Sequence, residues 1–281
     1  MSRTLAFIGL VLLVSGGFLH SQTPQASCTF KIHALASNPN VMVTGVNDFG
    51  TIVGMADFGT SSSPQFRAFI LYPDGSTVYW PPSGAKMSSF GGHNDVYAYT
   101  GVYVDSSNTR HAFLLNRGNL SSIVRPYGSV PAGINKYNSI VGSYSDSNGN
   151  SHGFKRYSNG TVVHLNYPGA VGTHAIGIND SGAIVGFYDG TDGAEHGFIY
   201  HNGAWAKLQL PNAPLSTELY GISNAGVIVG QGQAHAYLYA SGQAKEIVVP
   251  GSTETDVRGI APKGLIAGMS DNKHAFLATC H

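Results

Sequence analysis

A pair of glycines nine residues apart recurs six times along this chain of 281 residues. The first glycine opens a word of the type Gly-Ile-Asn-Asp, and the second closes a word of the type Ile-Val-Gly. The six pairs are Gly45 and Gly54, Gly92 and Gly101, Gly133 and Gly142, Gly177 and Gly186, Gly221 and Gly230, and Gly259 and Gly268. Successive copies start 38 to 47 residues apart. This period predicts a repeat protein in which each copy is one supersecondary unit.

Each copy reads as four short strands. The first ends at Gly-Ile-Asn-Asp, and Ile-Val-Gly-x-Tyr forms the second after a turn that contains glycine. The third carries His-Ala-Phe or a variant, and a hairpin dipeptide such as Asn202-Gly203 leads into the fourth. Four strands in a period of this length predict an all-β, six-bladed β-propeller of four-stranded antiparallel blades. We expect it to form a single domain over residues 23–281.

The sixth copy has no fourth strand of its own, because few residues follow His274-Ala-Phe276. Residues 29–35 precede the first copy and resemble a fourth strand, so we expect them to pair with 273–279 and close the ring. Counting along the repeat places Cys280 where Asn202 stands in the fourth copy, and Cys28 at about the position of Gly203. A disulfide between Cys28 and Cys280 is therefore expected in place of a hairpin turn. Lipidation of Cys28 and two free thiols are the alternatives.

Residues 1–22 have the three regions of a secretory signal peptide. Arg3 precedes an apolar run from Leu5 to Val14, and small and polar residues follow. We expect cleavage near Ser21 or Gln22, and a secreted protein that is extracellular or periplasmic. A membrane anchor is the alternative, but glycines and polar residues interrupt the run before it reaches the length of a bilayer span. No membrane insertion is expected after cleavage.

Charge excludes two classes of partner. Fifteen Lys and Arg residues balance fifteen Asp and Glu residues, so the net charge is zero. No basic surface is thus expected for nucleic acid or for an anionic membrane. We expect a monomer whose partner is a glycan or an extracellular protein.

The repeated words resemble those of a known family. Gly-Ile-Asn-Asp, Ile-Val-Gly-x-Tyr and His-Ala-Phe or His-Gly-Phe are similar to the bacterial extracellular repeats of the HAF family, over residues 45–279. The similarity is clearest over 177–198. It is weaker in the first copy, where Arg67 replaces the histidine, and in the last, where Ala261-Pro262 replace Asn-Asp. The resemblance implies an exported repeat protein and brings no reaction or catalytic residue.

Two sets of polar residues are expected to be structural. The histidines of the His-x-Phe words occupy one place in different blades, so they cannot converge and should hydrogen-bond a strand or a turn. They are His111, His152, His196, His235 and His274. Residues 146–150 and 189–193 resemble fragments of calcium loops but lack the bidentate Glu, which favours polar turns. No metal or cofactor is expected, with Ca²⁺ as the alternative.

Side chains of different blades can converge only near the axis. If the Gly-Ile-Asn strand is innermost, the residues three before each first glycine line the mouth of the channel: Met42, Ser89, Val130, His174, Glu218 and Asp256. His174, Glu218 and Asp256 form a polar arc, with Tyr220 and Arg258 nearby. With these two neighbours, the three residues of the arc could bind a ligand, hold a cation or act as acid and base.

The same face carries variable connections, which are common sites of binding on rigid scaffolds. Tyr127, Tyr167 and Trp80 lie near this rim and could stack on a sugar or a peptide, although packing within a blade fits Trp80 better. The predicted function is therefore non-catalytic binding of a glycan or a protein at this loop face. A hydrolase or lyase at the channel mouth using His174, Glu218 and Asp256, and a structural protein of an envelope or matrix, are the alternatives.

Overall fold

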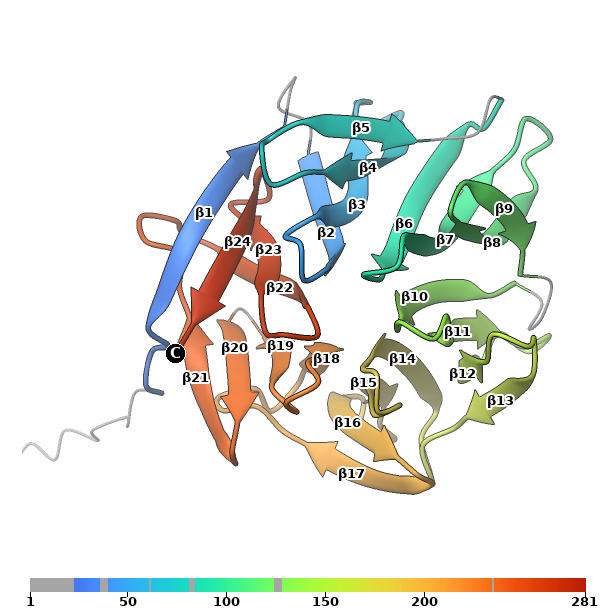
Figure 1. Ribbon diagram of the computed structural model, residues 1–281. Coiled ribbons are helices and arrows are strands. Elements are labelled where there is room, and N and C mark those ends of the chain that lie inside the picture. Colours follow the sequence, from blue (N-terminus) through green and yellow to red (C-terminus); the bar gives the residue numbers. More distant parts are fainter. Residues whose placement is uncertain (1–22, 36–39, 61, 81–83, 124–127, 234) are drawn as a thin grey trace, which may run out of the picture.

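The structure is a computed structural model that describes residues 23–35, 40–60, 62–80, 84–123, 128–233 and 235–281. Six antiparallel sheets of four strands stand around a common axis as the blades of a β-propeller, as predicted (Figure 1). The predicted signal peptide, 1–22, lies outside the described residues. No helix among those described is long and apolar enough to cross a membrane.

The first strand of each repeat copy is innermost in its blade. Blade 1 contains β2 (Asn40–Val46), β3 (Ile52–Asp57), β4 (Phe66–Leu71) and β5 (Thr77–Trp80). Blade 2 contains β6 (Met87–His93), β7 (Ala98–Val104), β8 (Arg110–Asn116) and β9 (Asn119–Ser122). Blade 3 contains β10 (Val130–Ile134), β11 (Ile140–Ser145), β12 (Ser151–Arg156) and β13 (Val162–Leu165). Blade 4 contains β14 (Gly172–Ile178), β15 (Ile184–Asp189), β16 (Glu195–His201) and β17 (Ala204–Leu208). Blade 5 contains β18 (Thr217–Ile222), β19 (Ile228–Gly232), β20 (His235–Ala240) and β21 (Gln243–Ile247).

Blade 6 combines both ends of the described chain. It contains β22 (Thr255–Ile260), β23 (Ile266–Ser270), β24 (His274–Cys280) and, as its outer strand, β1 (Cys28–Ala34) (Figure 1). β1 pairs with β24 antiparallel, and Cys28 and Cys280 form a disulfide. Both the predicted closure and the predicted disulfide are confirmed.

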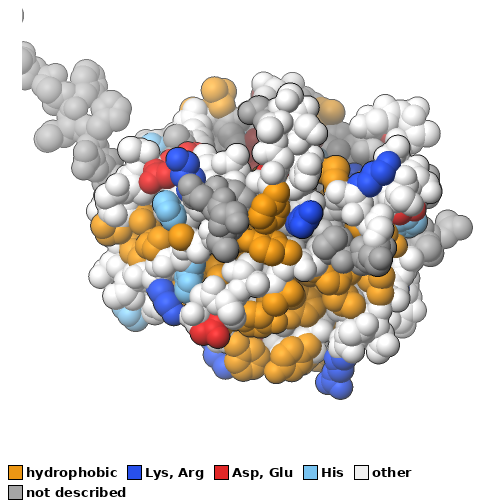
Figure 2. All heavy atoms as spheres, turned by 90° about the horizontal axis from the view of Figure 1, so that it is seen from above, with side chains coloured by type: hydrophobic (Ala, Val, Ile, Leu, Met, Phe, Trp, Pro, Cys, Tyr) orange, Lys and Arg blue, Asp and Glu red, His pale blue; other side chains and the backbone are white. Residues whose placement is uncertain are grey.

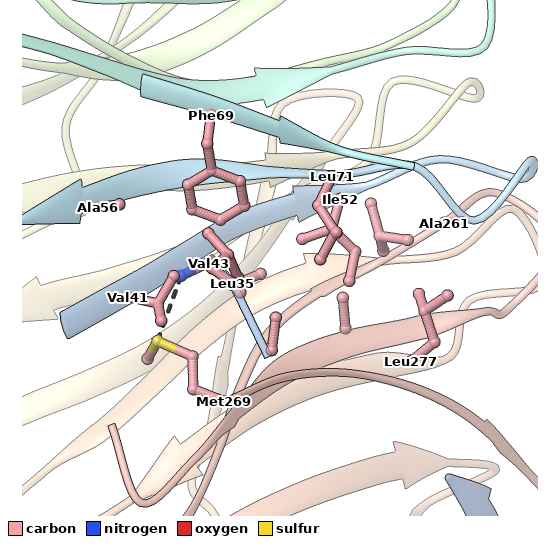
Figure 3. Packing of buried hydrophobic residues seen from close by; sticks show 13 residues of the cluster. Leu35, Val41, Val43, Ile52, Ala56, Phe69, Leu71, Ala261, Met269 and Leu277 are labelled. Carbon is pink, nitrogen blue, oxygen red and sulfur yellow. Dashed lines mark hydrogen bonds between the residues drawn. The ribbon is translucent and has the colours of Figure 1, made fainter. Parts of the chain in front are cut away.

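Apolar side chains fill the seam between blade 6 and blade 1. Val43 and Phe69 of blade 1 and Met269 of blade 6 belong to one buried cluster (Figure 3). The backbone N–H of Val43 donates to Sδ of Met269 at 3.2 Å, drawn as a dashed line in Figure 3. The seam is packed like a protein interior, which stabilises the closed ring.

The first glycine of each copy allows neighbouring inner strands to meet. A Cβ on Gly45 would lie 3.4 Å from Cα of Gly92 in the next blade, and one on Gly259 would lie 3.3 Å from Cα of Gly45. On Gly177 it would lie 2.9 Å from Cα of Gly221. A side chain at Gly177 would force the blades to shift at the axis, whereas one at Gly45 or Gly259 would leave little or no free space between them.

All six inner strands have a β-bulge at the residue just before the first glycine. The second glycine, on the neighbouring strand, lies against this bulge. A Cβ on Gly186 would lie 1.9 Å from the carbonyl oxygen of His174, and one on Gly54 would lie 2.0 Å from that of Met42. The bulge and its glycine therefore depend on each other, and bulges of this kind redirect side chains.

The Asn of Gly-Ile-Asn-Asp joins adjacent blades. Asn179 Oδ1 accepts the backbone N–H of Ala183 at 2.9 Å, and Asn179 Nδ2 donates to the carbonyl oxygen of Ser223 in the next blade at 3.0 Å. Asn94 and Asn135 make the same inter-blade bond. One side chain thus caps its own turn and ties two blades.

Four of the five repeated histidines, His111, His152, His196 and His235, hydrogen-bond polar side chains near their own strands, which fits the structural role expected of them. His111 Nε2 lies 2.8 Å from Asp105 Oδ2, and His152 Nε2 lies 3.1 Å from Asp146 Oδ2. His196 contacts Asp192 in the same way. The tyrosine of Ile-Val-Gly-x-Tyr stacks on the imidazole in blades 2 and 3, and the phenylalanine of His-x-Phe is buried in the blade core.

The outer surface of the ring is mixed in character. Figure 2 views the side on which β1 and β5 lie and shows hydrophobic side chains gathered over its lower half, with charged ones scattered among them. Ile32 on β1 and Val78 on β5 are exposed. Single exposed apolar residues are normal on protein surfaces, so we place no site there.

Candidate functional site

The channel has two ends of different construction. The loop face carries the connections that lead into the inner strands, together with loops such as 105–109 and 190–194. The turn face carries the turns that follow the inner strands, such as 47–51 and 179–183. The residues that stand three positions before each first glycine lie near the loop face. Tyr220 and Arg258, which stand at the bulges, line a cavity that continues toward the turn face.

Four side chains from blades 5 and 6 form a connected group, which we call the channel-mouth cluster: Glu218, Tyr220, Asp256 and Arg258. The Tyr220 hydroxyl donates to Glu218 Oε2 at 2.7 Å. Arg258 donates from Nε and Nη2 to Asp256 Oδ2, at 2.9 and 2.6 Å. The Arg258 guanidinium lies 4.4 Å from the centre of the Tyr220 ring, which is a cation–π contact between the blades.

Asp256 is the most constrained member of the cluster. It is only 5% exposed, and its Oδ1 has no hydrogen-bond partner among the described residues. Burial raises the pKa of Asp256, against the opposing effect of Arg258. Burial also raises the pKa of Tyr220 strongly, so its hydroxyl keeps its proton and donates. An acceptor that is buried without a donor is costly, so Asp256 Oδ1 is the least satisfied atom of the cluster.

Gln231 adds a second acceptor of this kind. It lies directly opposite Glu218 in the β18–β19 register, and its Oε1 is buried without a partner in the described part of the chain. Cross-strand neighbours share one face of a sheet, so Gln231 and Glu218 extend from the same side of blade 5.

His174 is oriented differently. Its Nε2 lies 3.1 Å from Asp189 Oδ2, and its ring stacks on Phe187 at a centroid distance of 4.5 Å. These partners belong to β15 of its own blade. The structure therefore joins Glu218 and Asp256 with Tyr220 and Arg258 but shows no described hydrogen bond from His174 to any of the four.

The predicted aromatic residues that are described pack against other aromatic side chains within or between blades. Tyr167 stacks face to face on Tyr188 at 3.8 Å. Trp80 packs on Phe90 and Phe113, the blade packing expected for it. Tyr127 lies outside the described residues.

Across the mouth, blades 1 to 3 provide an apolar wall. A hollow of about 450 Å³ on the loop face includes Ser89 and Val130 together with Met55, Phe66 and Val102. The mouth thus has a polar half formed by the channel-mouth cluster and an apolar half opposite it.

The possible calcium loops are hydrogen-bonded turns. Asp146 Oδ1 accepts the backbone N–H groups of Asn148 and Asn150 at 2.8 and 2.9 Å. Asp146 Oδ2 accepts Asn150 Nδ2 at 2.9 Å. Among the described residues, no group of three or more His, Cys, Asp or Glu could hold a metal ion.

Comparison with known proteins supports the fold. No family model and no curated protein matches this sequence, so the HAF resemblance stays a prediction. The chain is similar in structure to virginiamycin B lyase from Staphylococcus aureus (10% identity, TM-score 0.52, covering 90% of this chain and 99% of that one). It is also similar to the gluconolactonase XC5397 from Xanthomonas campestris (10%, 0.53, 92% and 97%) and to a putative TolB from Agrobacterium tumefaciens (9%, 0.59, 92% and 99%). At these identities the similarity shows the β-propeller fold alone.

Proposed function

We propose that this chain is a non-catalytic recognition propeller that binds a glycan through the channel-mouth cluster on its loop face. The observation that carries this proposal is Asp256 Oδ1, a buried acceptor without a donor, beside an arginine that already holds Oδ2. A sugar hydroxyl would supply the missing hydrogen bond. Glu218 and Gln231 add acceptors on the neighbouring blade.

A glycan fits the two halves of the mouth better than a protein surface does. A sugar presents hydroxyl groups at its edge and C–H groups on its faces. The cluster can accept the hydroxyls, and the wall around Val102 and Val130 can pack on the apolar face.

The hydrogen bonds of the two carboxylates favour ligand binding over catalysis. Arg258 contacts Asp256 through two nitrogens, and Tyr220 holds Glu218, so both carboxylates are already oriented by neighbours. A hydrolase or lyase would need one of them as a free acid or base. His174, the third predicted catalytic residue, is paired with Asp189.

Export is part of the proposal. A disulfide between Cys28 and Cys280 persists in an oxidising compartment, in agreement with the signal peptide that the first 22 residues predict. The resemblance to HAF repeats points the same way.

The test is a glycan array probed with the protein from residue 23 onward, followed by calorimetric titration of each glycan bound. We expect Asp256→Asn and Glu218→Gln to weaken binding at least tenfold. Tyr220→Phe should weaken it less, because the ring under Arg258 stays in place. The matched control is Glu195→Gln, which changes a loop-face carboxylate that bonds Ser216 outside the cluster.

Circular dichroism and thermal melting would show that each variant is folded. Loss of binding in the folded cluster variants, with binding kept by the control, would support the proposal. Wild-type affinity in a folded Asp256→Asn variant would contradict it. Hydrolysis or elimination of a chromogenic glycoside by the wild type, lost in Asp256→Asn, would favour the enzyme instead.

A further inference from the structure

We infer that the turn face, at the opposite end of the channel, carries a second binding site for a neutral polysaccharide chain. Its aromatic side chains lie at the other end of the channel from the channel-mouth cluster, whose members Tyr220 and Arg258 line the deep part of the cavity between the two ends. Three exposed aromatic side chains and a small polar cavity beside them form the site. We call these side chains the aromatic arc: Phe49, Tyr97 and Tyr137.

The aromatic arc lies on three consecutive blades. Each residue belongs to the turn that follows the inner strand of blade 1, 2 or 3. Phe49 is 61% exposed, Tyr97 65% and Tyr137 58%. The corresponding turns of blades 4, 5 and 6 carry Ser181, Ala225 and Lys263. The aromatic side chains therefore occupy one half of the turn face and not the whole ring.

Hydrogen bonds between the turns hold the arc in place. The backbone N–H of Asp48 donates to Asp95 Oδ1 at 2.8 Å and joins the turns of blades 1 and 2. Asn94 Nδ2 donates to Asn135 O at 2.8 Å and to Asn138 Oδ1 at 3.0 Å, which joins blades 2 and 3. A surface ordered in this way loses little conformational entropy when a ligand binds.

A polar cavity opens beside the arc. Its volume is about 70 Å³, and Asp95, Lys136 and Asp180 contribute to its wall. The ammonium of Lys136 lies 3.5 Å from Asp180 Oδ2 and 5.1 Å from the centre of the Tyr137 ring. A cavity of this size holds a few water molecules. A whole sugar ring is too large for it, whereas one hydroxymethyl group fits.

His93 is an unusual residue in the wall of this cavity. It lines the same cavity, in the position where four other copies have isoleucine. It is 6% exposed, and neither ring nitrogen has a hydrogen-bond partner of acceptable geometry among the described residues. A buried polar group without a partner is costly, so the histidine reduces the stability of this inner strand relative to the isoleucine of the other copies.

The chemistry favours a neutral polysaccharide. Sugar rings can lie on the aromatic side chains with their C–H faces, while a hydroxymethyl group enters the cavity. Positive and negative side chains are mixed around it: Lys136 and Lys263 pair with Asp180 and Asp48. The side chains around the cavity therefore produce no strong electrostatic potential of one sign that would attract a charged polymer. Every large exposed hydrophobic side chain of the three turns is aromatic, which suits stacking on sugars better than an aliphatic protein interface.

The test is native affinity electrophoresis in gels that contain dextran, laminarin, galactomannan or hydroxyethylcellulose. The variant is Phe49→Ser, Tyr97→Asn and Tyr137→Ser together. Asparagine is chosen at position 97 because the backbone φ of Tyr97 is 64°, a conformation that asparagine tolerates. We expect at least one polysaccharide to retard the wild type. The triple variant should bind it more than tenfold more weakly, and each single variant about three- to tenfold more weakly.

The matched control removes exposed apolar side chains from the other face: Val171→Ser with Leu215→Ser. It should be retarded like the wild type, and so should Asp256→Asn, because Asp256 lies toward the loop face and does not line the cavity. Equal retardation of the wild type and the triple variant overturns the inference, and so does a wild type that none of the four polymers retards. The inference would also be contradicted if light scattering showed that the wild type forms a dimer and the triple variant does not, because the aromatic arc would then be a dimer interface.

Discussion

Cys280 lies directly opposite Cys28 at the ends of β24 and β1. In blade 4, the equivalent places are taken by Asn202 and Gly203, the two residues of the turn between β16 and β17. The disulfide therefore stands where a hairpin turn connects the outer two strands of another blade. It links segments that are 252 residues apart in the sequence and so holds the ring closed covalently.

Replacing both cysteines, Cys28→Ser with Cys280→Ser, should lower the free energy of unfolding. Loop entropy gives an upper value of about 5 kcal/mol for a loop of this length. Urea denaturation followed by tyrosine fluorescence measures it. The wild type under reducing conditions is the control and should lose a similar amount, whereas an unchanged midpoint in both would show that packing of the seam alone closes the ring.

Much of the fold could be predicted because its signals are periodic. Six glycine pairs set the number of blades, and the missing last strand required a partner from the beginning of the chain. The inter-blade role of Asn179 could not be predicted, because its partner Ser223 lies one full repeat away in sequence and nothing in the local pattern indicates it.

The candidate site was predictable in position but not in detail. Register along the inner strands placed Glu218 and Asp256 near the axis together with Tyr220 and Arg258. The pairing of His174 with Asp189 depends on a side-chain rotamer, which the sequence pattern does not determine. The aromatic arc was missed because its members do not share one repeat position: Tyr97 stands one place later in its turn than Phe49 and Tyr137 do in theirs.

Asn179→Ala should destabilise the protein by about 3 kcal/mol, because it leaves the Ala183 N–H and the Ser223 carbonyl without their partner in a buried position. Thermal and urea unfolding measure the effect. Asn159→Ala is the matched control, since Asn159 caps only an exposed turn at Thr161, and it should cost less than about 1 kcal/mol. Equal effects of the two changes would contradict the inter-blade role.

Gly186→Ala should be more damaging, at roughly 3 kcal/mol or more, because the new methyl group would overlap the carbonyl oxygen of His174 and force the bulge to open. Gly193→Ala is the comparison. Gly193 has a φ of 78° but open space around its Cβ position, so its cost is about 1 kcal/mol from backbone strain alone. Similar stabilities of the two variants would show that the bulge adapts without cost.

His93→Ile tests the buried imidazole through the pH dependence of stability. Burial lowers the pKa of His93 to about 3, against a smaller opposite effect of the Thr51 backbone. Its ordinary pKa in an unfolded chain is about 6.5, so between these values the unfolded state binds a proton that the folded state does not. Stability must therefore fall as the pH falls, by about 3 kcal/mol between pH 7 and pH 4 from this group.

The isoleucine variant lacks this group and places the residue of the other copies in the same apolar surroundings, so it should be more stable than the wild type at pH 7. Its advantage should then grow as the pH is lowered, because the wild type alone must keep a buried imidazole neutral. Urea unfolding at pH 7, 5.5 and 4 measures both effects, with His201→Ile as the control at an exposed histidine. If the wild type and His93→Ile lost the same stability as the pH fell, His93 would be protonated in the folded protein as easily as in the unfolded chain. A partner for the protonated ring would then already be present inside the folded protein.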